Sequence, residues 1–207
     1  MTDTPSLRRS FSQSSIRSFV AVPLTDAVQT QIAEAARGLA RELPQESIKW
    51  SRKPENLHVT MKFLGPVAVE RLDALSAAMN GALAAVPRFG FGVRGWGAFP
   101  SERDAKVLFA AVDDERGLAA VAEVVEAVSE RFGFPREARR FTGHVTIGRS
   151  KAGVDARAAL AAGAARAFGE VEVTEVHVYE SRLGQPGDAG STYVLRHRVS
   201  LGARVAN

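Results

Sequence analysis

The sequence predicts an α+β protein with two similar lobes that face each other across a cleft. Three observations support this fold class. Short apolar runs typical of strands are interspersed with longer segments of helical periodicity. The pattern His-Val-Thr, followed by an apolar residue, occurs at His58 and again at His144, 86 residues later. The chain has 207 residues, 45% of them apolar, which is enough for two lobes to share one core.

The first quarter of the chain reads as strand, helix and short strand. Residues 17–23 form an apolar run that ends at a proline, as expected of a buried strand. Residues 27–43 place apolar side chains on one helical face, and Pro44 ends that helix. A short or edge strand is expected at 48–50, and 54–56 should turn into the first motif strand.

Alternation in the first motif predicts which side chains share a face. Leu57, Val59, Met61 and Phe63 alternate with His58, Thr60 and Lys62. Successive side chains of a strand point to opposite faces, so the three polar residues are expected on one face. In the second copy Val145 and Ile147 point inward, which leaves His144 and Thr146 on the other face. Each copy therefore offers an imidazole beside a hydroxyl.

The remaining elements follow from periodicity and from glycine and proline signals. Gly65-Pro66 is expected to stop the first motif strand, and 95–104 is expected to be a loop. The apolar phase slips near Thr174, which predicts a bulge or a late start within a strand at 171–181. The other expected elements are helices at 69–86 and 117–132, strands at 89–93, 106–112 and 192–201, a weak alanine-rich helix at 155–168 interrupted by Gly163, and a glycine-rich turn at 183–190.

Composition limits the class of protein. There are no cysteines, which excludes disulfides, thiolate catalysis and Cys-based zinc sites and suits a reducing cytosol. No apolar run reaches the roughly 18–20 residues of a membrane span. Residues 1–16 are rich in Ser, Thr and Arg and are expected to be a disordered basic tail. We therefore expect one bilobal domain at 17–207, cytoplasmic and monomeric.

Positive charge is concentrated around the second motif. The formal net charge is +4, and residues 135–157 hold six cations against two carboxylates. This concentration suits an anionic ligand such as a phosphate. A solvated arginine-rich loop is the alternative interpretation.

Two His-Thr pairs suit phosphoryl chemistry. Imidazole has a pKa of about 6.5, so one histidine can be a general base while the other is a general acid. Threonine hydroxyls can donate to the non-bridging phosphate oxygens, where charge builds in the transition state. Lys62, Arg140 or Arg149 could add positive charge beside the phosphate.

A metal site is the competing interpretation of the histidines. A typical zinc site needs three or four ligands, and no third ligand accompanies either motif at ligand spacing. No glycine-rich phosphate loop precedes a helix, so nothing calls for ATP. We therefore expect neither a metal nor a cofactor. His177 and His197 lack the accompanying threonine and are interpreted as structural or surface residues.

At these motifs the chain resembles the RNA 2′,3′-cyclic phosphodiesterases, also called 2′-5′ RNA ligases, of the two-histidine phosphoesterase superfamily. The resemblance covers about residues 17–201. It rests on PENLHVTMKFLG (54–65), RRFTGHVTIGRS (139–150) and YESRL (179–183), with FVAVPL, WGAFP and KVLFAAV in matching order.

This resemblance implies the bilobal two-histidine phosphoesterase fold, in which two similar lobes of antiparallel-rich sheet with outer helices surround a central basic cleft. It also implies metal- and ATP-independent opening of RNA 2′,3′-cyclic phosphate ends to 2′-phosphomonoesters, and the reverse 2′-5′ ligation. By analogy His144 activates water and His58 protonates the departing 3′-oxygen. Thr60 and Thr146 bind the phosphate, and Arg149 supports it.

One departure from the family is visible, because Gly143 stands where members commonly carry proline. We expect glycine to loosen the approach to His144. Two rival functions stay open at this stage. One is a two-histidine phosphodiesterase acting on 2′-5′ oligonucleotides or cyclic nucleotides, and the other is a non-catalytic module that binds RNA ends.

Overall fold

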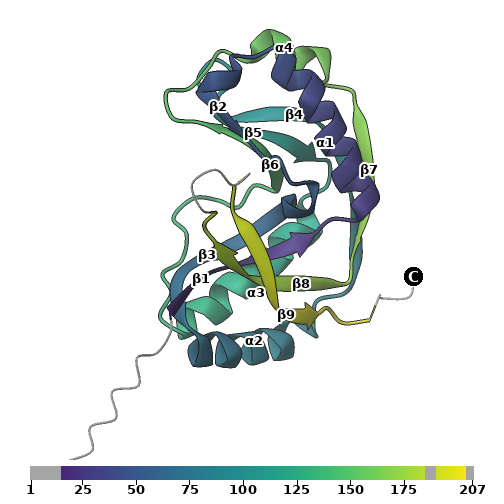
Figure 1. The fold of residues 1–207 in the computed structure, drawn as a ribbon. Coiled ribbons are helices and arrows are strands. Elements are labelled where there is room, and N and C mark those ends of the chain that lie inside the picture. The colour runs from purple at the N-terminus through teal and green to yellow at the C-terminus, as the bar shows by residue number, and fades with distance from the viewer. Residues whose placement is uncertain (1–14, 185–189, 204–207) are drawn as a thin grey trace, which may run out of the picture.

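The computed structural model describes residues 15–184 and 190–203. Its elements, in chain order, confirm the expected α+β class (Figure 1). They are β1 (Ser15–Pro23), α1 (Asp26–Arg41), η1 (Gln45–Ser47), β2 (Ile48–Trp50), η2 (Pro54–Asn56), β3 (His58–Ala68), α2 (Val69–Leu83), β4 (Phe89–Pro100), β5 (Ala105–Val112), α3 (Arg116–Arg131), β6 (His144–Ser150), α4 (Arg157–Ala162), β7 (Ala167–Val173), β8 (Glu175–Arg182) and β9 (Thr192–Ser200).

All the named strands belong to one curled sheet. Its order is β7-β4-β5-β6-β3-β1-β8-β9, and β2 pairs with β6 off this path. The paired strands run antiparallel. The two motif strands, β3 and β6, lie at the centre, with three further strands of this path on the outer side of each. The sheet path therefore has two halves of equal strand number that meet where the motifs meet.

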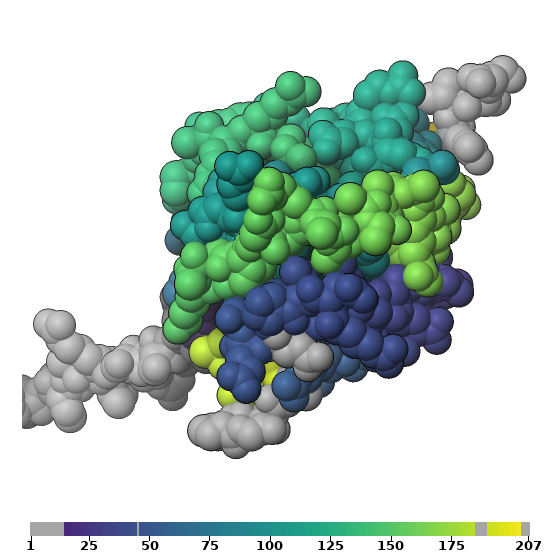
Figure 2. All heavy atoms as spheres, turned by 90° about the horizontal axis from the view of Figure 1, so that it is seen from above, coloured from purple at the N-terminus to yellow at the C-terminus, as the bar shows by residue number. Residues whose placement is uncertain are grey.

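The halves do not correspond to the two halves of the sequence. The C-terminal strands β8 and β9 join β1 and β3, while β2 and β4 to β7 form the other half (Figure 1). Helices α2 and α3 pack together beside β3 and β9, whereas α1 packs against β7. Figure 2 shows α1 alongside the green α4–β7 segment on one face of the molecule. The chain thus crosses between the halves several times.

The helices follow the expected apolar faces. In α1 the side chains of Val28, Ile32 and Leu39 are buried, and the Thr25 side chain caps the helix by accepting from the Val28 N–H. Apolar side chains from both halves of the sheet form one core, in which Val59 and Val145 are fully buried. None of the described helices is long and apolar enough to cross a membrane.

Two strands continue past the ends that the sequence predicts. Gly65-Pro66 does not stop β3, which continues to Ala68 with Pro66 paired to Arg17. Gly65 takes a φ of +71°, so the backbone bends there without leaving the sheet. Strand β4 likewise runs on to Pro100 through the expected loop, with a register shift between Val93 and Trp96.

Of the two expectations for the phase slip at Thr174, the late start is confirmed and the bulge is wrong, because the chain changes its strand partner there. Strand β7 ends at Val173 and pairs with β4, whereas β8 begins at Glu175 and pairs with β1. The single strand expected at 171–181 is therefore two strands in opposite halves of the sheet. Of the expected disordered tail, Ser15 and Ile16 belong to β1, and 1–14 lie outside the described residues. Part of the expected 183–190 turn, 185–189, also lies outside them.

A bulge in β3 reverses the expected phase of the first motif. Ala21 of β1 pairs with Thr60, but the next residue, Val20, pairs with Lys62, so Met61 is an extra residue in β3. A bulge re-aims the side chains that follow it. Lys62 consequently shares the core face with Val20. The expectation that Lys62 lies beside the histidine and threonine is wrong.

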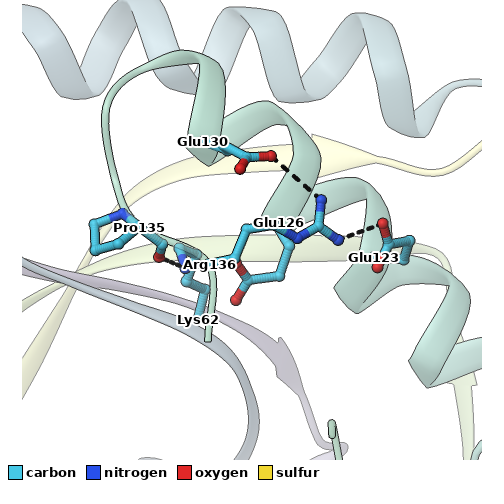
Figure 3. A network of polar contacts seen from close by, with 6 residues as sticks. All are labelled: Lys62, Glu123, Glu126, Glu130, Pro135 and Arg136. Atoms are coloured by element: carbon cyan, nitrogen blue, oxygen red, sulfur yellow. Dashed lines mark hydrogen bonds and ion pairs between the residues drawn. The ribbon is translucent and has the colours of Figure 1, made fainter. Parts of the chain in front are cut away.

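Lys62 forms a buried ion pair behind the motif strand. Its ammonium donates to the Glu126 carboxylate of α3 at 2.7 Å and to the Pro135 carbonyl at 2.8 Å (Figure 3). The Lys62 side chain is 1% exposed and that of Glu126 is 12% exposed. Arg136, next to Pro135, pairs with Glu123 and Glu130 of the same helix. The network ties β3 and α3 to the start of the segment that leads to His144.

We expect Lys62→Met to lower the free energy of unfolding by about 3 kcal/mol, because it leaves the Glu126 charge buried without a partner. Urea-induced unfolding measures this loss. Adding Glu126→Leu should restore part of the stability. Lys106→Met is the matched control, because Lys106 makes an exposed pair with Asp104 and should change stability by less than about 1 kcal/mol. A stable Lys62→Met protein with a raised KM would instead support the phosphate-binding role expected from the sequence.

Candidate active site

The two His-Thr pairs lie on one face of the central strands. Strands β3 and β6 pair at a single position, Val59 with Val145. In an antiparallel pair, the residues on either side of that position face each other. His58 is therefore placed opposite Thr146, and Thr60 opposite His144. The structure brings together the four residues that the motif pattern predicted.

A second bulge adds Arg149 to the same face. In the pairing with β5, Thr146 faces Phe109 and Gly148 faces Leu108, so Ile147 is extra in β6. This bulge lies one residue after the threonine, as the Met61 bulge does in β3. Five residues beyond each histidine, the chain therefore presents Arg149 in β6 and Phe63 in β3 to the same side.

Both imidazoles are oriented by the same backbone contact. His58 Nδ1 donates to the Asn56 carbonyl at 2.7 Å, and His144 Nδ1 donates to the Thr142 carbonyl at 2.8 Å. A carbonyl only accepts, so the proton of the neutral ring is on Nδ1 and the lone pair is on Nε2. His58 Nε2 lies 3.1 Å from the Thr60 hydroxyl oxygen. Each histidine is thus prepared to exchange a proton through Nε2.

Aromatic rings enclose each histidine. Phe19 and Tyr193 pack on His58 with centroid distances of 4.9 and 5.4 Å. Phe99 and Phe109 pack on His144 at 5.1 and 5.3 Å. These contacts remove water from the rings, which disfavours the charged imidazolium.

The neutral form of both histidines is favoured. Burial lowers the pKa of His58 to about 4, against the opposing effect of its bond to Asn56, and the charges of Arg149 and His144 lower it further. Burial also lowers the pKa of His144, and the Arg149 charge adds to that effect. The Glu115 carboxylate acts in the opposite direction on His144. No described carboxylate has this effect on His58.

A pocket of about 530 Å³ opens beside these residues. The pocket lies between β3 and the part of β6 that no longer pairs with β3. From Gly148 onward β6 pairs with β2 instead, so residues of all three strands line the pocket. His58, Thr60, Thr146 and Arg149 line it. His144 is not among its lining residues, although its charge reaches His58.

The pocket lining is strongly basic. Arg17, Lys49, Arg52 and Arg149 line it, and no aspartate or glutamate does so among the residues that the structure describes. None of the four cations pairs with a described carboxylate. Such a concentration of like charge favours an anionic ligand.

Two residues expected at the phosphate lie elsewhere. Lys62 points to the opposite face of the sheet, as described above. Arg140 is exposed in the segment between α3 and β6 and does not line the pocket. Within 15–184 and 190–203, no three His, Cys, Asp or Glu side chains cluster in a way that could hold a metal ion.

Several pocket residues were missed from the sequence. The alternation places Phe63 on the apolar face with Val59 and Met61, but Phe63 is 61% exposed and lines the pocket. The missed cations are Arg17 near the start of β1, Lys49 in β2 and Arg52 just after β2. Nothing in the local pattern distinguishes these cations from other surface residues, because their place depends on which strands become neighbours.

Gly143 is held more firmly than its lack of a side chain suggests. It is buried, and its N–H donates to the Glu115 carboxylate at 3.1 Å. A proline at this position would have no N–H to donate. A Cβ on Gly143 would also come within 2.9 Å of a Val112 methyl. The departure from the family pattern thus supplies a hydrogen bond between the start of α3 and the residue before His144.

Comparison with known proteins identifies a matching family model and similar proteins over most of the chain. The family model described as LigT like Phosphoesterase matches residues 22–109 and 111–187. The chain is 30% identical to the RNA 2′,3′-cyclic phosphodiesterase of Archaeoglobus fulgidus over 173 residues, which cover 83% of this chain and 94% of that protein.

Solved structures show the same fold. The crystal structure of TT0787 of Thermus thermophilus has a TM-score of 0.69 at 27% identity, covering 91% of this chain and 99% of that chain. E. coli LigT complexed with 3′-AMP has a TM-score of 0.70 at 24% identity, covering 90% of this chain and 98% of that chain.

Glu115 and Arg149 have opposite effects on the pKa of His144, and substitution of each residue tests its effect. Glu115→Gln keeps an oxygen for the Gly143 N–H but removes a negative charge, so the pKa of His144 should fall further while that of His58 stays the same. Arg149→Gln removes a positive charge, so the pKa of both histidines should rise. Titration of the imidazole resonances by NMR measures both changes. If the His144 pKa did not respond to Glu115→Gln, the carboxylate would have no electrostatic role at this site.

Proposed function

Because the chain belongs to the LigT-like phosphoesterase family, we propose that it opens 2′,3′-cyclic phosphates at RNA ends to 2′-phosphomonoesters. His58 and His144 act as the acid–base pair. The observation that carries the proposal is the matched geometry of the two imidazoles. Both hold their proton on Nδ1, and both lie on one face of adjacent strands beside a basic pocket. The relative from A. fulgidus bears the name of this activity.

The reaction needs one proton removed and one supplied. Water attacks phosphorus while His144 Nε2 takes its proton, following the role that the resemblance assigns. The bond from phosphorus to the 3′-oxygen breaks, and protonated His58 gives its proton to that oxygen. The product carries a phosphate on the 2′-oxygen, and one water has been added. For ligation, an RNA 5′-hydroxyl replaces water as the attacking group, which forms a 2′-5′ bond.

Thr60, Thr146 and Arg149 serve the phosphate in this proposal. The hydroxyls donate to its non-bridging oxygens, and the guanidinium neutralises the charge that builds in the transition state. The exposed ring of Phe63 offers a flat surface on which a base can stack. The phosphate and the base thus each have a suitable surface in one pocket.

Substrate binding has to change the protonation of His58. With a pKa of about 4, His58 is neutral near pH 7 and is not yet an acid. An anionic phosphate beside the ring favours the charged form and raises the pKa. The substrate therefore promotes uptake of the proton that its own leaving group receives.

The first test is turnover of a short RNA ending in a 2′,3′-cyclic phosphate, with EDTA present and the 2′- and 3′-phosphate products resolved. We expect the 2′-phosphate alone. His58→Ala and His144→Ala should each lower kcat by at least roughly 10²-fold, because each removes one half of a coupled proton transfer. His197→Ala is the matched control, since His197 pairs with Asp73 away from the pocket and should retain full activity.

The other outcomes identify the rival functions. Binding of the RNA end by folded protein without turnover would indicate a non-catalytic module. Turnover of a 2′-5′ linkage or another cyclic nucleotide, with none on the RNA end, would indicate a different phosphodiester substrate. Activity abolished by EDTA and restored by zinc would contradict the metal-independent mechanism.

A sulfur substitution separates the acid from the base. Replacing the 3′-oxygen of the cyclic phosphate by sulfur creates a leaving group that departs without a proton. If His58 is the acid, His58→Ala should regain most of the wild-type rate on this substrate, while His144→Ala should stay inactive. Rescue of His144→Ala alone would reverse the two roles and leave the rest of the proposal in place.

A further inference from the structure

The pocket holds more positive charge than one phosphate requires. Of its four lining cations, Arg149 comes from β6, the strand that also carries His144. Lys49 lies in β2, Arg52 just after β2, and Arg17 near the start of β1, so these three come from strands other than β6. The charge is therefore spread away from the reaction centre, along the pocket.

The strand pairing shows how the cations are arranged. Lys49 of β2 is the direct cross-strand partner of Arg149 of β6. On the other side of β6, Arg149 is paired with Val107 of β5. Directly opposed residues share a face, with Cβ atoms about 5 Å apart, and like charges so placed destabilise a sheet. Lys49 and Arg149 are both exposed, and neither has a carboxylate partner among the described residues. An anion held between or beyond them would relieve this repulsion.

The segment after β2 continues the line of charge and is held in place. The Ser51 N–H donates to the Ile147 carbonyl at 2.8 Å, so the backbone follows β6 up to the residue before Arg52. Farther on, Lys53 donates to the Thr192 hydroxyl at 3.1 Å, and Asn56 donates to the Ser191 carbonyl at 2.7 Å. Hydrogen bonds of the residues before and after Arg52 thus hold its segment in place at the edge of the pocket.

We propose that Lys49 and Arg52 form a second phosphate-binding subsite, which takes the 5′-phosphate of the nucleotide that carries the cyclic phosphate. In an RNA chain this is the phosphodiester that joins the terminal nucleotide to the preceding one. The inference rests on the proposed function, because the cyclic phosphate must lie at His58, Thr146 and Arg149 for the next phosphate to reach β2. It makes an RNA end, or a 5′-phosphorylated nucleotide, a better substrate than a bare nucleoside cyclic phosphate.

Three substrates test the subsite: a nucleoside 2′,3′-cyclic phosphate, the same compound with a 5′-phosphate, and a dinucleotide ending in the cyclic phosphate. We expect kcat/KM to be roughly tenfold higher for the second and third than for the first, mainly through KM. The gain should shrink as salt concentration rises, because exposed charges are screened.

The variant Lys49→Gln/Arg52→Gln should bring the kcat/KM ratio of the 5′-phosphorylated to the unphosphorylated substrate close to one. Arg41→Gln/Arg88→Gln is the matched control, since it removes two exposed cations that do not line the pocket and should keep the wild-type ratio. Thermal unfolding of both variants checks that each is folded.

The outcomes separate the subsite from the reaction itself. Equal turnover of all three substrates by the wild type would overturn the subsite and leave the proposed function standing. A 5′-phosphate gain that survives in Lys49→Gln/Arg52→Gln would place the second phosphate elsewhere, with Arg17 of β1 as the remaining cation of the pocket. Absence of turnover on all three, and on longer RNA, would instead contradict the proposed function.

Discussion

The whole site depends on one antiparallel contact between β3 and β6. Val59 and Val145 pair there, and both side chains are fully buried. This contact places each histidine opposite the threonine of the other strand, so four polar groups meet at the centre of a nine-stranded sheet. Val59 and Val145 are the one pair that β3 and β6 form, so the two strands diverge beyond it. The space that opens between them is the pocket, and β2 bounds it by pairing with the part of β6 that β3 has left.

Bulges determine what else reaches that pocket. Met61 and Ile147 are both extra residues, and each directly follows the threonine of its motif. The reversal of phase brings Phe63 to the site from one strand and Arg149 from the other. The same reversal turns Lys62 into the core, where it binds Glu126 and supports the segment before His144. Equivalent backbone shapes thus supply an aromatic surface from one half of the sheet and a cation from the other.

Local sequence patterns predicted much of the fold and the four central side chains. The alternation around His58 and the helical spacing of Val28, Ile32 and Leu39 are properties of short segments, so they can be read without knowledge of neighbours. The bulges at Met61 and Ile147 arise from register with β1 and β5, which local alternation does not contain. For the same reason the sequence indicated a slip at Thr174 but did not reveal that β7 and β8 belong to opposite halves of the sheet, or that Lys49 lies beside Arg149.

Both histidines donate from Nδ1 to the backbone carbonyl two residues before them, but the side chains around the two rings differ. His58 lies between Phe19 and Tyr193 with no described carboxylate acting on it, whereas Glu115 acts on His144 through both its charge and the Gly143 N–H. Arg149 opposes protonation of both rings. Near pH 7 the neutral forms therefore dominate until an anion enters. An anionic phosphate changes this balance, because it offsets Arg149 and favours an imidazolium beside it. Binding of the substrate and uptake of the catalytic proton are thereby a single electrostatic event in the proposed mechanism.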